Sequence, residues 1–497
     1  MDALPQRMSA YRALREQVER ALLPLASSLD GRRFSLQASL HDLQLRPGGY
    51  VTLRDDAGHE RLGQLESLEL VREEAANLAL PSAQDDVPSI STRLIVRCAR
   101  GEGRLVDDDP TAFHDYLASP ADPRRVAAWL AARGARAPLP IGELARADGV
   151  PYAIDARGFD RHTFFCGQSG SGKTYSLGVV LEQLLINTEL RVIVLDPNSD
   201  FVRLREAHPR ADPGVAQTWA SAAARIAVHA ATVPTHPLDE PLRLRFPELS
   251  PAAHAALLRL DPIDDREEYS DLAQLLRERP GDVEALGRAL AGEGRRLATR
   301  ARNLGVDRFA VWARERPGSL LDALDRDDWR CLVVDLGSLP EPAEQALVSG
   351  ALLEGLWARR QQRRPVLVVI DEAHNVCPAA PENPLTALAT DAAVRIAAEG
   401  RKFGIYLLVS TQRPQKVHPN VVSQCDNLVL MRLNSAADAA HAASVFSFVP
   451  PALIEQATGF GLGESLVAGR ISPHPAFVRF GARVAQEGGA DVPSDWA

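Results

Sequence analysis

Lysine is almost missing from this chain: of its 56 basic residues only three are lysine, namely Lys173, Lys402 and Lys416. The others are arginine, as a GC-rich genome would produce. A compact ammonium can sit beside a phosphate in a way that a forked guanidinium does not reproduce. We therefore expect at least one of these lysines to be kept for its chemistry, while chance survival is an equal alternative for Lys402 and Lys416.

Paired cysteines and long apolar runs are also missing. None of the five cysteines forms a C-x-x-C pair, so neither a zinc site nor a disulfide framework is indicated, and we expect buried thiols in a reducing compartment. No apolar run approaches the ~20 residues that a membrane-spanning helix needs. The start "MDALPQRMSAYRALREQVER" contains acidic residues and no apolar core, so it does not resemble a secretory signal. These features predict a cytoplasmic protein that is not bound to a membrane.

An excess of positive charge is missing as well, since the net charge is −9. This excludes a polycationic surface, so any binding of nucleic acid depends on a local basic area. The length of 497 residues is enough for roughly three domains.

The first third of the chain predicts a helix followed by a small β-domain. The apolar spacing of residues 9–28 fits one amphipathic helix, and we assign residues 1–30 to it. Segments such as "RRFSLQASL", "GYVTLRDD" and "RLGQLESLEL" then alternate apolar and polar residues between turns, which is typical of an antiparallel barrel. We assign residues 31–155 to this domain, with short helices near Asp109–Leu117 and Pro123–Arg133.

From Arg161 the pattern becomes α/β. Short apolar strands alternate with helices in "HTFFC", "RVIVLD", "CLVVDL", "VLVVID", "IYLLVS" and "NLVLMRL", which predicts a parallel sheet covered on both faces. Between residues 246 and 326 the strand pattern stops, and about four amphipathic helices are predicted as an inserted bundle. The α/β core then occupies residues 156–245 and 327–484, and residues 485–497 are expected to form a flexible tail.

A glycine-rich loop follows the strand "HTFFC" and opens a helix, which is the context of a nucleoside triphosphate site. Glycines let backbone amides approach phosphates, and the helix N-terminus adds partial positive charge. We expect Lys173 to reach the β- and γ-phosphates of ATP and Thr174 to hold Mg²⁺. The nucleotide-binding residues are predicted to be Gly167, Gln168, Ser169, Gly170, Ser171, Gly172, Lys173 and Thr174.

A pair of acidic residues follows the buried strand in "VLVVIDEAHN". We predict that Asp371 is the acid on the metal side and that Glu372 is the base that polarises the attacking water. The letters "DEAH" also occur in helicases that carry two RecA-like domains in one chain. Only 126 residues follow Asp371, and no second domain fits in them.

Efficient hydrolysis needs a further positive charge at the γ-phosphate. Because no second domain supplies it, we expect a neighbouring subunit of a ring to do so. The candidates for this charge precede or follow the strand "IYLLVS": Arg395, Arg401 and Lys402 before it, and Arg413 and Lys416 after it. Gln412 ends that strand next to the expected γ-phosphate, where its amide can sense the phosphate or position water. A solvated salt-bridge role is as good an explanation for any single arginine. Asp196 and Asp200, at the end of another strand, either approach the nucleotide or only form a turn.

Together these segments resemble the HerA/FtsK superfamily of ring-forming, DNA-pumping ATPases, and HerA most closely. The residues that carry the resemblance are "RHTFFCGQSGSGKT", "VIVLDPNSDF", "VVIDEAHN", "AAEGRKFGIYLLVSTQRPQKV" and "GLGESLVAGRISPHPAFVRF", in the order of the family and across most of residues 160–480. The segment "LRPGGYVTLRDDAGHERLGQLESLEL" looks like the small barrel that precedes the HerA core. One departure is that "NSD" at Asn198–Asp200 replaces the usual His-Gly-Glu.

The resemblance implies a RecA-like P-loop core, a homohexamer with ATP sites between subunits, and double-stranded DNA in the central channel. It implies nucleotide roles for Lys173, Thr174, Asp371, Glu372 and Gln412, and a trans-acting arginine at Arg401 or Arg395. Lys402, Arg413 and Lys416 are candidates for contacts with DNA phosphates. Such proteins commonly work with a nuclease, in end resection or anti-phage defence.

Two other functions remain open at this point. The first is an ATP-assembled scaffold ring that activates an effector protein without pumping DNA. The second is a conjugation or secretion ATPase of the same superfamily. The paired Asp371 and Glu372 favour hydrolysis over assembly alone, and the lack of an apolar span weakens the secretion hypothesis.

Overall fold

The computed structural model describes residues 22–40, 43–71, 76–77, 93–94, 98–231, 236–278, 295–313 and 318–488, together with Ser9, Arg12, Ala13, Glu16 and Arg20. They form two compact units. The first contains the described residues up to Arg133 with the short segments Leu144–Pro151 and Pro450–Gln456. The second contains Gly134–Glu143, Tyr152–Val449 and the described residues from Ala457 onward.

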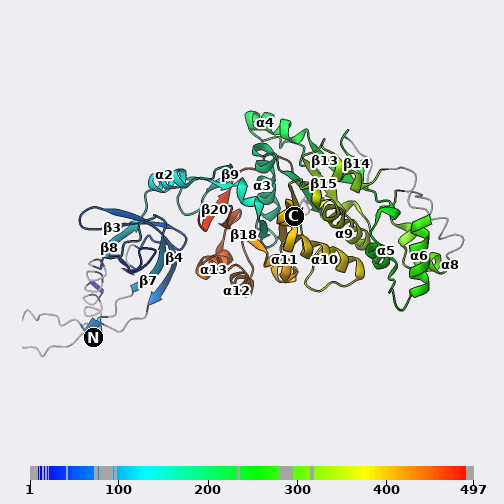
Figure 1. The fold of residues 1–497 in the computed structure, drawn as a ribbon. Helices are drawn as coiled ribbons and strands as arrows, with labels where there is room; N and C mark the ends of the chain where they lie inside the picture. Colours follow the sequence, from blue (N-terminus) through cyan, green and yellow to red (C-terminus); the bar gives the residue numbers. More distant parts are fainter. Residues whose placement is uncertain are drawn as a thin grey trace, which may run out of the picture. The chain divides into compact units, whose positions relative to one another are not determined.

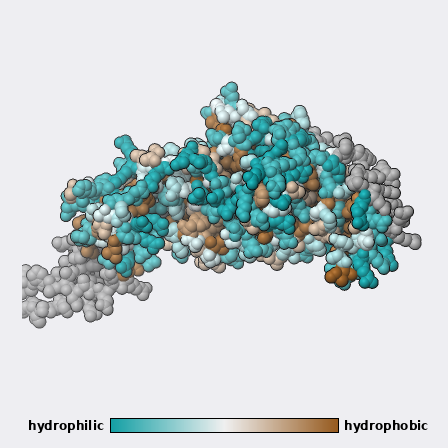
Figure 2. Space-filling model, viewed as in Figure 1, coloured by the Kyte–Doolittle hydropathy of each residue, from teal (hydrophilic) through white to brown (hydrophobic). Residues whose placement is uncertain are grey.

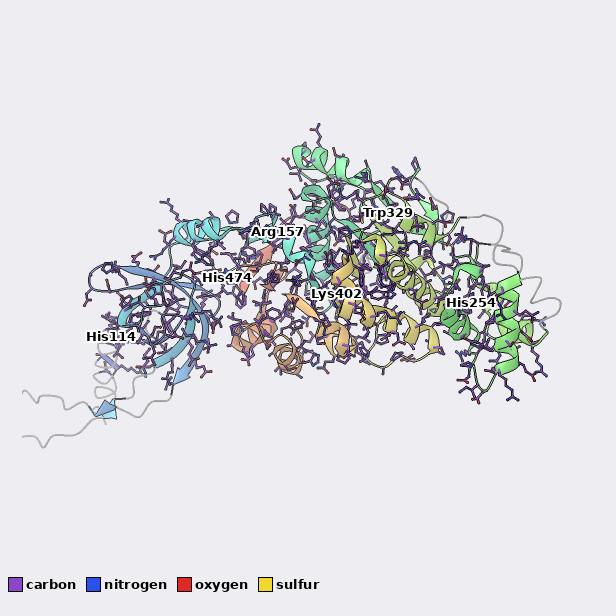
Figure 3. All side chains as sticks on the ribbon, viewed as in Figure 1. His114, Arg157, His254, Trp329, Lys402 and His474 are labelled. Atoms are coloured by element: carbon purple, nitrogen blue, oxygen red, sulfur yellow. The ribbon has the colours of Figure 1, made fainter. Side chains whose placement is uncertain are left out.

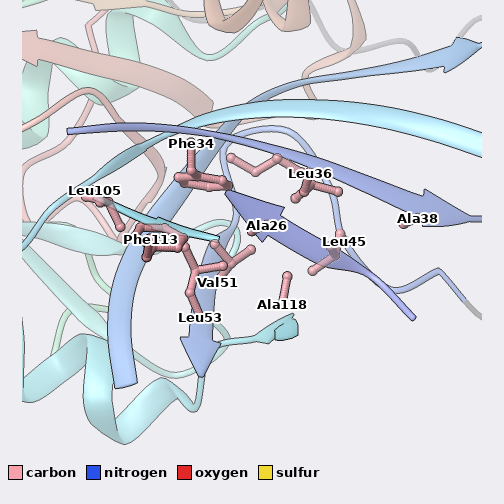
Figure 4. Packing of buried hydrophobic residues seen from close by; sticks show 11 residues of the cluster. Ala26, Phe34, Leu36, Ala38, Leu45, Val51, Leu53, Leu105, Phe113 and Ala118 are labelled. Atoms are coloured by element: carbon pink, nitrogen blue, oxygen red, sulfur yellow. The ribbon is translucent and has the colours of Figure 1, made fainter. Parts of the chain in front are cut away.

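The first unit is built on a closed antiparallel barrel (Figure 1). Its strands, in spatial order, are β1 (Leu25–Ser28), β2 (Arg33–Ser39), β7 (Cys98–Leu105), β4 (Glu60–Val71), β3 (Tyr50–Arg54) and β8 (Phe113–Pro120). Alternate residues point inward, so Phe34, Leu36 and Ala38 of β2 meet Leu53 and Phe113 in the barrel core (Figure 4). The expected small barrel is confirmed. The unit also holds the two-residue strands β5 (Ala76–Asn77) and β6 (Arg93–Leu94), helix α2 (Pro123–Arg133) and helix α13 (Pro451–Glu455).

Two predictions for this unit are wrong. The segment near Asp109–Leu117 was expected to be helical, but residues from Phe113 form β8, which pairs with both β1 and β3 and closes the barrel. The N-terminal helix was expected to reach residue 28, but Leu25–Ser28 is β1. In both places the partners that select a strand lie far away in the sequence. Most of the predicted N-terminal helix lies outside the described residues.

The second unit is organised around a twelve-stranded sheet of order β10-β9-β20-β19-β18-β11-β17-β16-β12-β15-β13-β14. The strands from β18 to β14 run parallel, whereas β19 is antiparallel to both of its neighbours, β18 and β20. Their bounds are β9 (Pro138–Leu144), β10 (Pro151–Asp155), β11 (His162–Cys166), β12 (Arg191–Asp196), β13 (Ile226–Ala230), β14 (Glu240–Pro241), β15 (Cys331–Asp335), β16 (Val366–Ile370), β17 (Ile405–Thr411), β18 (Cys425–Leu430), β19 (Glu464–Gly469) and β20 (Ala476–Phe480). All residues of β11, β15 and β16 are buried, as a sheet covered on both faces requires. The expected parallel α/β core is confirmed, but β9 and β10 join this sheet although residues 31–155 were assigned to the barrel domain.

Helices surround this sheet (Figure 1). Helix α3 contacts α4, and α9 packs along α10, which also touches β17. Their bounds are α3 (Lys173–Asn187), α4 (Pro213–Ala223), α9 (Pro342–Ala358), α10 (Pro384–Glu399), α11 (Pro419–Val422) and α12 (Ala436–Val445). The visible face of this unit is largely hydrophilic (Figure 2), and none of the helices in the described part of the chain is both long and apolar enough to cross a membrane.

The inserted helices lie between β14 and β15. The described ones are α5 (Pro251–Leu258), α6 (Arg266–Glu278) and α8 (Arg295–Asn303), and α8 contacts both of the others. The prediction of a helix over "RFAVWARER" is wrong for residues 309–313, because Trp312 forms a β-bridge with Leu244. Residues 485–488, expected in the flexible tail, are held by hydrogen bonds described below, and the rest of that tail lies outside the described residues.

Candidate nucleotide site

The glycine-rich loop connects β11 to α3 at the carboxyl edge of the sheet. Gly170 and Gly172 have φ of 72° and 89°, a left-handed region in which glycine carries no steric cost. Helix α3 begins directly after Gly172, at Lys173. The first amides of this 15-residue helix therefore point toward the loop, which is the geometry that binds phosphate at a helix N-terminus.

The loop is held in place by the neighbouring strand ends. Gly167 leaves no room for a side chain, because a Cβ there would lie 2.7 Å from both Met431 Cβ and Ser171 Oγ. Arg432 Nη2 donates a hydrogen bond to Gly170 O at 3.1 Å. The amide of Gly463 donates to Ser171 O at 3.1 Å. The loop is thus shaped before any ligand arrives, which lowers the entropic cost of binding.

Lys173 lies at the centre of the site. Its Nζ is 2.7 Å from Asp371 Oδ1, 3.0 Å from Ser410 Oγ and 3.2 Å from Glu372 Oε1, and the side chain is only 3% exposed. Burial alone would lower the pKa of Lys173, but the carboxylates of Asp371 and Glu372 outweigh it and raise the pKa. The ammonium is therefore charged and is neutralised by the two acids that were predicted to share the site.

One oxygen of Asp371 is suited to a cation. Oδ1 is occupied by Lys173 and by the hydroxyl of Ser410, which donates at 2.7 Å. Oδ2 is buried and has no hydrogen-bond partner among the residues that the structure describes. Hard oxygen donors of this kind are what Mg²⁺ prefers, and Thr174, in the first turn of α3, offers a hydroxyl next to Lys173. The donor set present therefore fits a magnesium ion.

Glu372 has an unusual backbone conformation, and its carboxylate contacts Gln412 and His374 in addition to Lys173. Its φ of 43° lies in the left-handed region, which a residue with a Cβ rarely adopts. Gln412 Nε2 donates to Glu372 Oε1 at 2.7 Å, and His374 Nδ1 lies 3.3 Å from Oε2. Burial lowers the pKa of His374, so the imidazole is neutral near pH 7. Strain of this kind clusters at functional sites, where the surroundings over-determine it.

Asp196 is used to build the loop that follows β12. Its buried carboxylate accepts hydrogen bonds from the amides of Asn198, Asp200 and Phe201, at 3.3, 3.0 and 2.8 Å. Ser199, with φ of 61°, donates through Oγ to Asp335 at 2.7 Å. The turn-forming explanation therefore holds for Asp196. Burial, reinforced by the Asp371 carboxylate, raises the pKa of Asp200 to about 6.

The end of the described chain is tied across α3. Arg483 and Glu182 form a buried ion pair at 3.3 Å, with side chains 2% and 1% exposed. Glu182 also accepts the amides of Val484 and Ala485, both at 2.8 Å. Further on, Gly488 donates its amide to Asp200 O at 2.8 Å. We call residues 481–488 the strap, since they connect the phosphate-loop helix to the loop of Asp200.

The candidate cations fall on two opposite edges of the sheet. Arg401 and Lys402 (Figure 3) directly precede β17, and Arg395 lies in the last turns of α10, so all three belong to the amino edge. Arg413 and Lys416 follow β17, on the carboxyl edge. At about 3.3 Å per residue, β17 separates the two groups by roughly 20 Å. Arg401 Nη1 is moreover bound to Asp426 at 2.8 Å, so none of the amino-edge cations belongs to the phosphate site of its own chain.

Three residues of the site were not predicted from the sequence: His374, Ser410 and Thr411. Ser410 contacts Lys173 and Asp371, and Thr411 Oγ1 lies 3.1 Å from His374 Nδ1. A usable signal was present, because two hydroxyl residues end the buried strand "IYLLVST" at the edge where Lys173 was expected. Four of the five cysteines, Cys166, Cys331, Cys377 and Cys425, are buried thiols as expected, whereas Cys98 is only partly buried.

Comparison with known sequences places this geometry in context. A family model described as the central domain of the helicase HerA matches residues 139–286. The DNA double-strand break repair helicase HerA of Sulfurisphaera tokodaii is 34% identical over 155 residues, which are 30% of either chain. The HerA of Pyrococcus furiosus is 32% identical over 136 residues, 26% of this chain and 24% of that protein. The matched region thus spans less than a third of these relatives.

Solved structures also align with the chain. VirB4 of Thermoanaerobacter pseudethanolicus aligns with a TM-score of 0.47 and 16% identity, covering 70% of this chain and 97% of VirB4. The bacterial conjugative coupling protein TrwB, lacking 70 N-terminal residues, aligns with a TM-score of 0.45 and 14% identity, covering 73% and 92%.

Proposed function

We propose that this chain hydrolyses ATP to move double-stranded DNA through a ring of identical subunits, because its residues 139–286 match the model of the HerA central domain and its glycine-rich loop follows a strand of a parallel α/β sheet. The observation that carries the proposal is the convergence of Lys173, Asp371 and Glu372 beside the glycine-rich loop. Both carboxylates have an oxygen within 3.2 Å of the Lys173 ammonium. Such a buried cluster of one cation and two acids is costly unless a charged ligand uses it.

ATP binding would rearrange this cluster. The phosphate oxygens compete with Glu372 for Lys173 Nζ, and their capture of the ammonium frees Glu372 Oε1 from the 3.2 Å contact. Glu372 can then accept the proton of a water molecule as the water oxygen attacks the γ-phosphorus. The bond from the γ-phosphorus to the bridging oxygen breaks, and ADP and phosphate form. Gln412, already bonded to Glu372, orients that water. Mg²⁺ would neutralise charge on the β- and γ-phosphates, and Thr174 and Asp371 are the residues that would hold it.

Arg413 lies on the carboxyl edge, near the phosphate site. Arg395 and Arg401, the two arginines that the resemblance marks as trans-acting, belong to the amino edge. We propose that one of them reaches the γ-phosphate bound to the next subunit, in a homohexamer. Subunit mixing tests this: Lys173→Ala and Arg401→Ala subunits should each be inactive alone and regain turnover when mixed. If only Arg395→Ala complements in this way, Arg395 is the trans-acting residue. If neither does, hydrolysis does not use these residues in trans.

Contacts with DNA are assigned by position. Arg413 and Lys416 are exposed on the loop after β17, next to the catalytic groups. Lys402 lies on the other edge of the sheet and cannot share a phosphate with them. We therefore propose Arg413 and Lys416 as the DNA-phosphate contacts closest to the ATP site, with affinity that falls as salt rises.

The cellular task follows from the relatives and remains a proposal. The curated relatives are named for DNA double-strand break repair. We propose that this chain is the motor for a separate nuclease or other effector, in end resection or in anti-phage defence. The alternative is a ring that ATP assembles around an effector without DNA transport.

ATP turnover of the purified protein tests the proposal. It is measured at two salt concentrations, with and without linear duplex DNA, and with a Glu372→Gln control. A DNA motor should be stimulated several-fold by DNA at low salt, lose that stimulation at high salt, and lose about 10²–10⁴-fold in turnover when Glu372 is replaced. Turnover that depends on Glu372 but ignores DNA would contradict the motor and favour the scaffold ring.

A further inference from the structure

Two neighbouring loops at the carboxyl edge carry different halves of the proposed function. The acid loop, residues 372–379, begins with Glu372 and follows β16. The basic loop, residues 412–418, follows β17 and carries Arg413 and Lys416, whose exposed side chains have no carboxylate partner within the described residues. The way in which these loops are joined indicates how one could control the other.

The backbones of the two loops are bonded at both ends. Near their start, the amide of Ala373 donates to Ser410 O at 2.9 Å. Near their end, the amide of Ala379 donates to Lys416 O at 2.8 Å and that of His418 donates to Cys377 O at 2.9 Å. A displacement of the basic loop must therefore either break these bonds or move the acid loop with it.

Between these ends, a series of polar contacts leads from the main chain of Arg413 to Glu372, the proposed catalytic base. The amide of Arg413 donates to Thr411 Oγ1 at 3.0 Å. The same oxygen lies 3.1 Å from His374 Nδ1, and that nitrogen lies 3.3 Å from Glu372 Oε2. Thr411 and His374 thus join the main chain of Arg413 to Oε2 of Glu372 by consecutive polar contacts. Gln412, the residue before Arg413, contacts the same carboxylate directly, through its amide N to Oε2 at 3.4 Å and through Nε2 to Oε1 at 2.7 Å.

We propose that the Thr411–His374 contact transmits the position of the basic loop to Glu372, so that DNA phosphates bound at Arg413 and Lys416 set the catalytic base. Thr411 and His374 are positioning residues in this proposal, which rests on the proposed DNA motor. When Arg413 moves onto a phosphate, its amide shifts the Thr411 hydroxyl, and the imidazole follows. Glu372, already strained at φ of 43°, then takes a different orientation toward the attacking water.

The test measures ATP turnover without DNA and with saturating duplex DNA, together with DNA affinity by fluorescence anisotropy. Thr411→Val removes the hydroxyl and should lower the stimulation ratio at least threefold, with DNA affinity changed less than twofold. Thr411→Ser keeps the hydroxyl and should keep the ratio. His374→Asn, whose amide can replace Nδ1, should retain more stimulation than His374→Ala. Thr218→Val is the matched control, because Thr218 also bonds through its hydroxyl but lies exposed on α4.

The outcomes separate the coupling from the motor itself. If DNA stimulates the wild type and Thr411→Val equally, the coupling is refuted and the motor stands. If Thr411→Val lowers both turnover values by the same factor, Thr411 is only structural and the coupling is again refuted. If DNA does not stimulate the wild type, both proposals fail. Should Thr411→Val not fold, the comparison of His374→Asn with His374→Ala decides in the same way.

Discussion

Removing the charge of Arg483 should reveal how strongly the strap holds the phosphate-loop helix. Arg483→Met keeps a long apolar side chain but leaves Glu182, which is 1% exposed, without a counter-charge. Loss of one partner from a buried ion pair costs about 3–5 kcal/mol. Glu182 keeps its hydrogen bonds from two backbone amides, so we expect the lower end of this range, about 3 kcal/mol, and a fall in Tm of roughly 4 °C.

Two further variants test the same reasoning. The double variant with Glu182→Gln and Arg483→Met should cost less than the sum of the two single changes, because it leaves neither buried charge in place, whereas each single change leaves one of them without the other. Gly178→Ala should also destabilise, since its Cβ would lie 2.5–2.9 Å from the pinned guanidinium. In the Arg483→Met background, the same alanine should be neutral or stabilising, because alanine favours a helix by about 1 kcal/mol over glycine.

The assay is chemical denaturation of the wild type, the three single variants and the two double variants, followed by fluorescence at pH 7. A cost below about 1 kcal/mol for Arg483→Met, or additive effects of the two partners, would refute the idea that this pair holds the strap. An equal penalty for Gly178→Ala in both backgrounds would show that the guanidinium is not what excludes its Cβ.

Three further outcomes are expected. Gly103→Ala should destabilise the barrel by about 1–3 kcal/mol, because its Cβ would overlap the Phe34 ring and Gln64 O, and thermal unfolding followed by circular dichroism should show the loss. Burial lowers the pKa of His162 to about 4, below the unfolded value of about 6.5. Between these pH values the unfolded chain binds one more proton than the folded chain, so the free energy of unfolding should fall by roughly 3 kcal/mol from pH 6.5 to pH 4. In His162→Gln this free energy should depend less steeply on pH. Lys173→Ala should weaken ATP binding by about tenfold or more through loss of a charge-assisted contact, measured with a fluorescent nucleotide, and unchanged affinity would contradict the assigned site.

The parallel core was predictable because its strands are encoded locally. "HTFFC" and "RVIVLD" are short apolar runs between turns, and the observed β11 and β12 match their bounds. The strand β8, which closes the predicted barrel, was not predictable in this way, because its partners β1 and β3 lie about 60 to 90 residues away along the chain. The alternation of "FHDYLASP" is too irregular to reveal a strand without those partners.

The same division holds for the site. The spacing of the glycine-rich loop and the acids after β16 predicted which residues meet, and Lys173, Asp371 and Glu372 do converge. The contact of Glu182 with Arg483 spans 301 residues and leaves no local pattern. Nor does sequence order reveal that Lys402 and Lys416, only 14 residues apart, lie on opposite edges, since that depends on the direction of β17.

The scarcity of lysine also makes the chain its own chemical reporter. Lys173 is buried, whereas Lys402 and Lys416 are exposed, one on each edge of the sheet. An amine-reactive acylating reagent read by mass spectrometry therefore has two accessible side-chain positions that report separately on the two edges. Protection of Lys416 alone would mark a ligand on the catalytic edge, and protection of Lys402 alone would mark a neighbour on the other. No engineered label is needed to distinguish them.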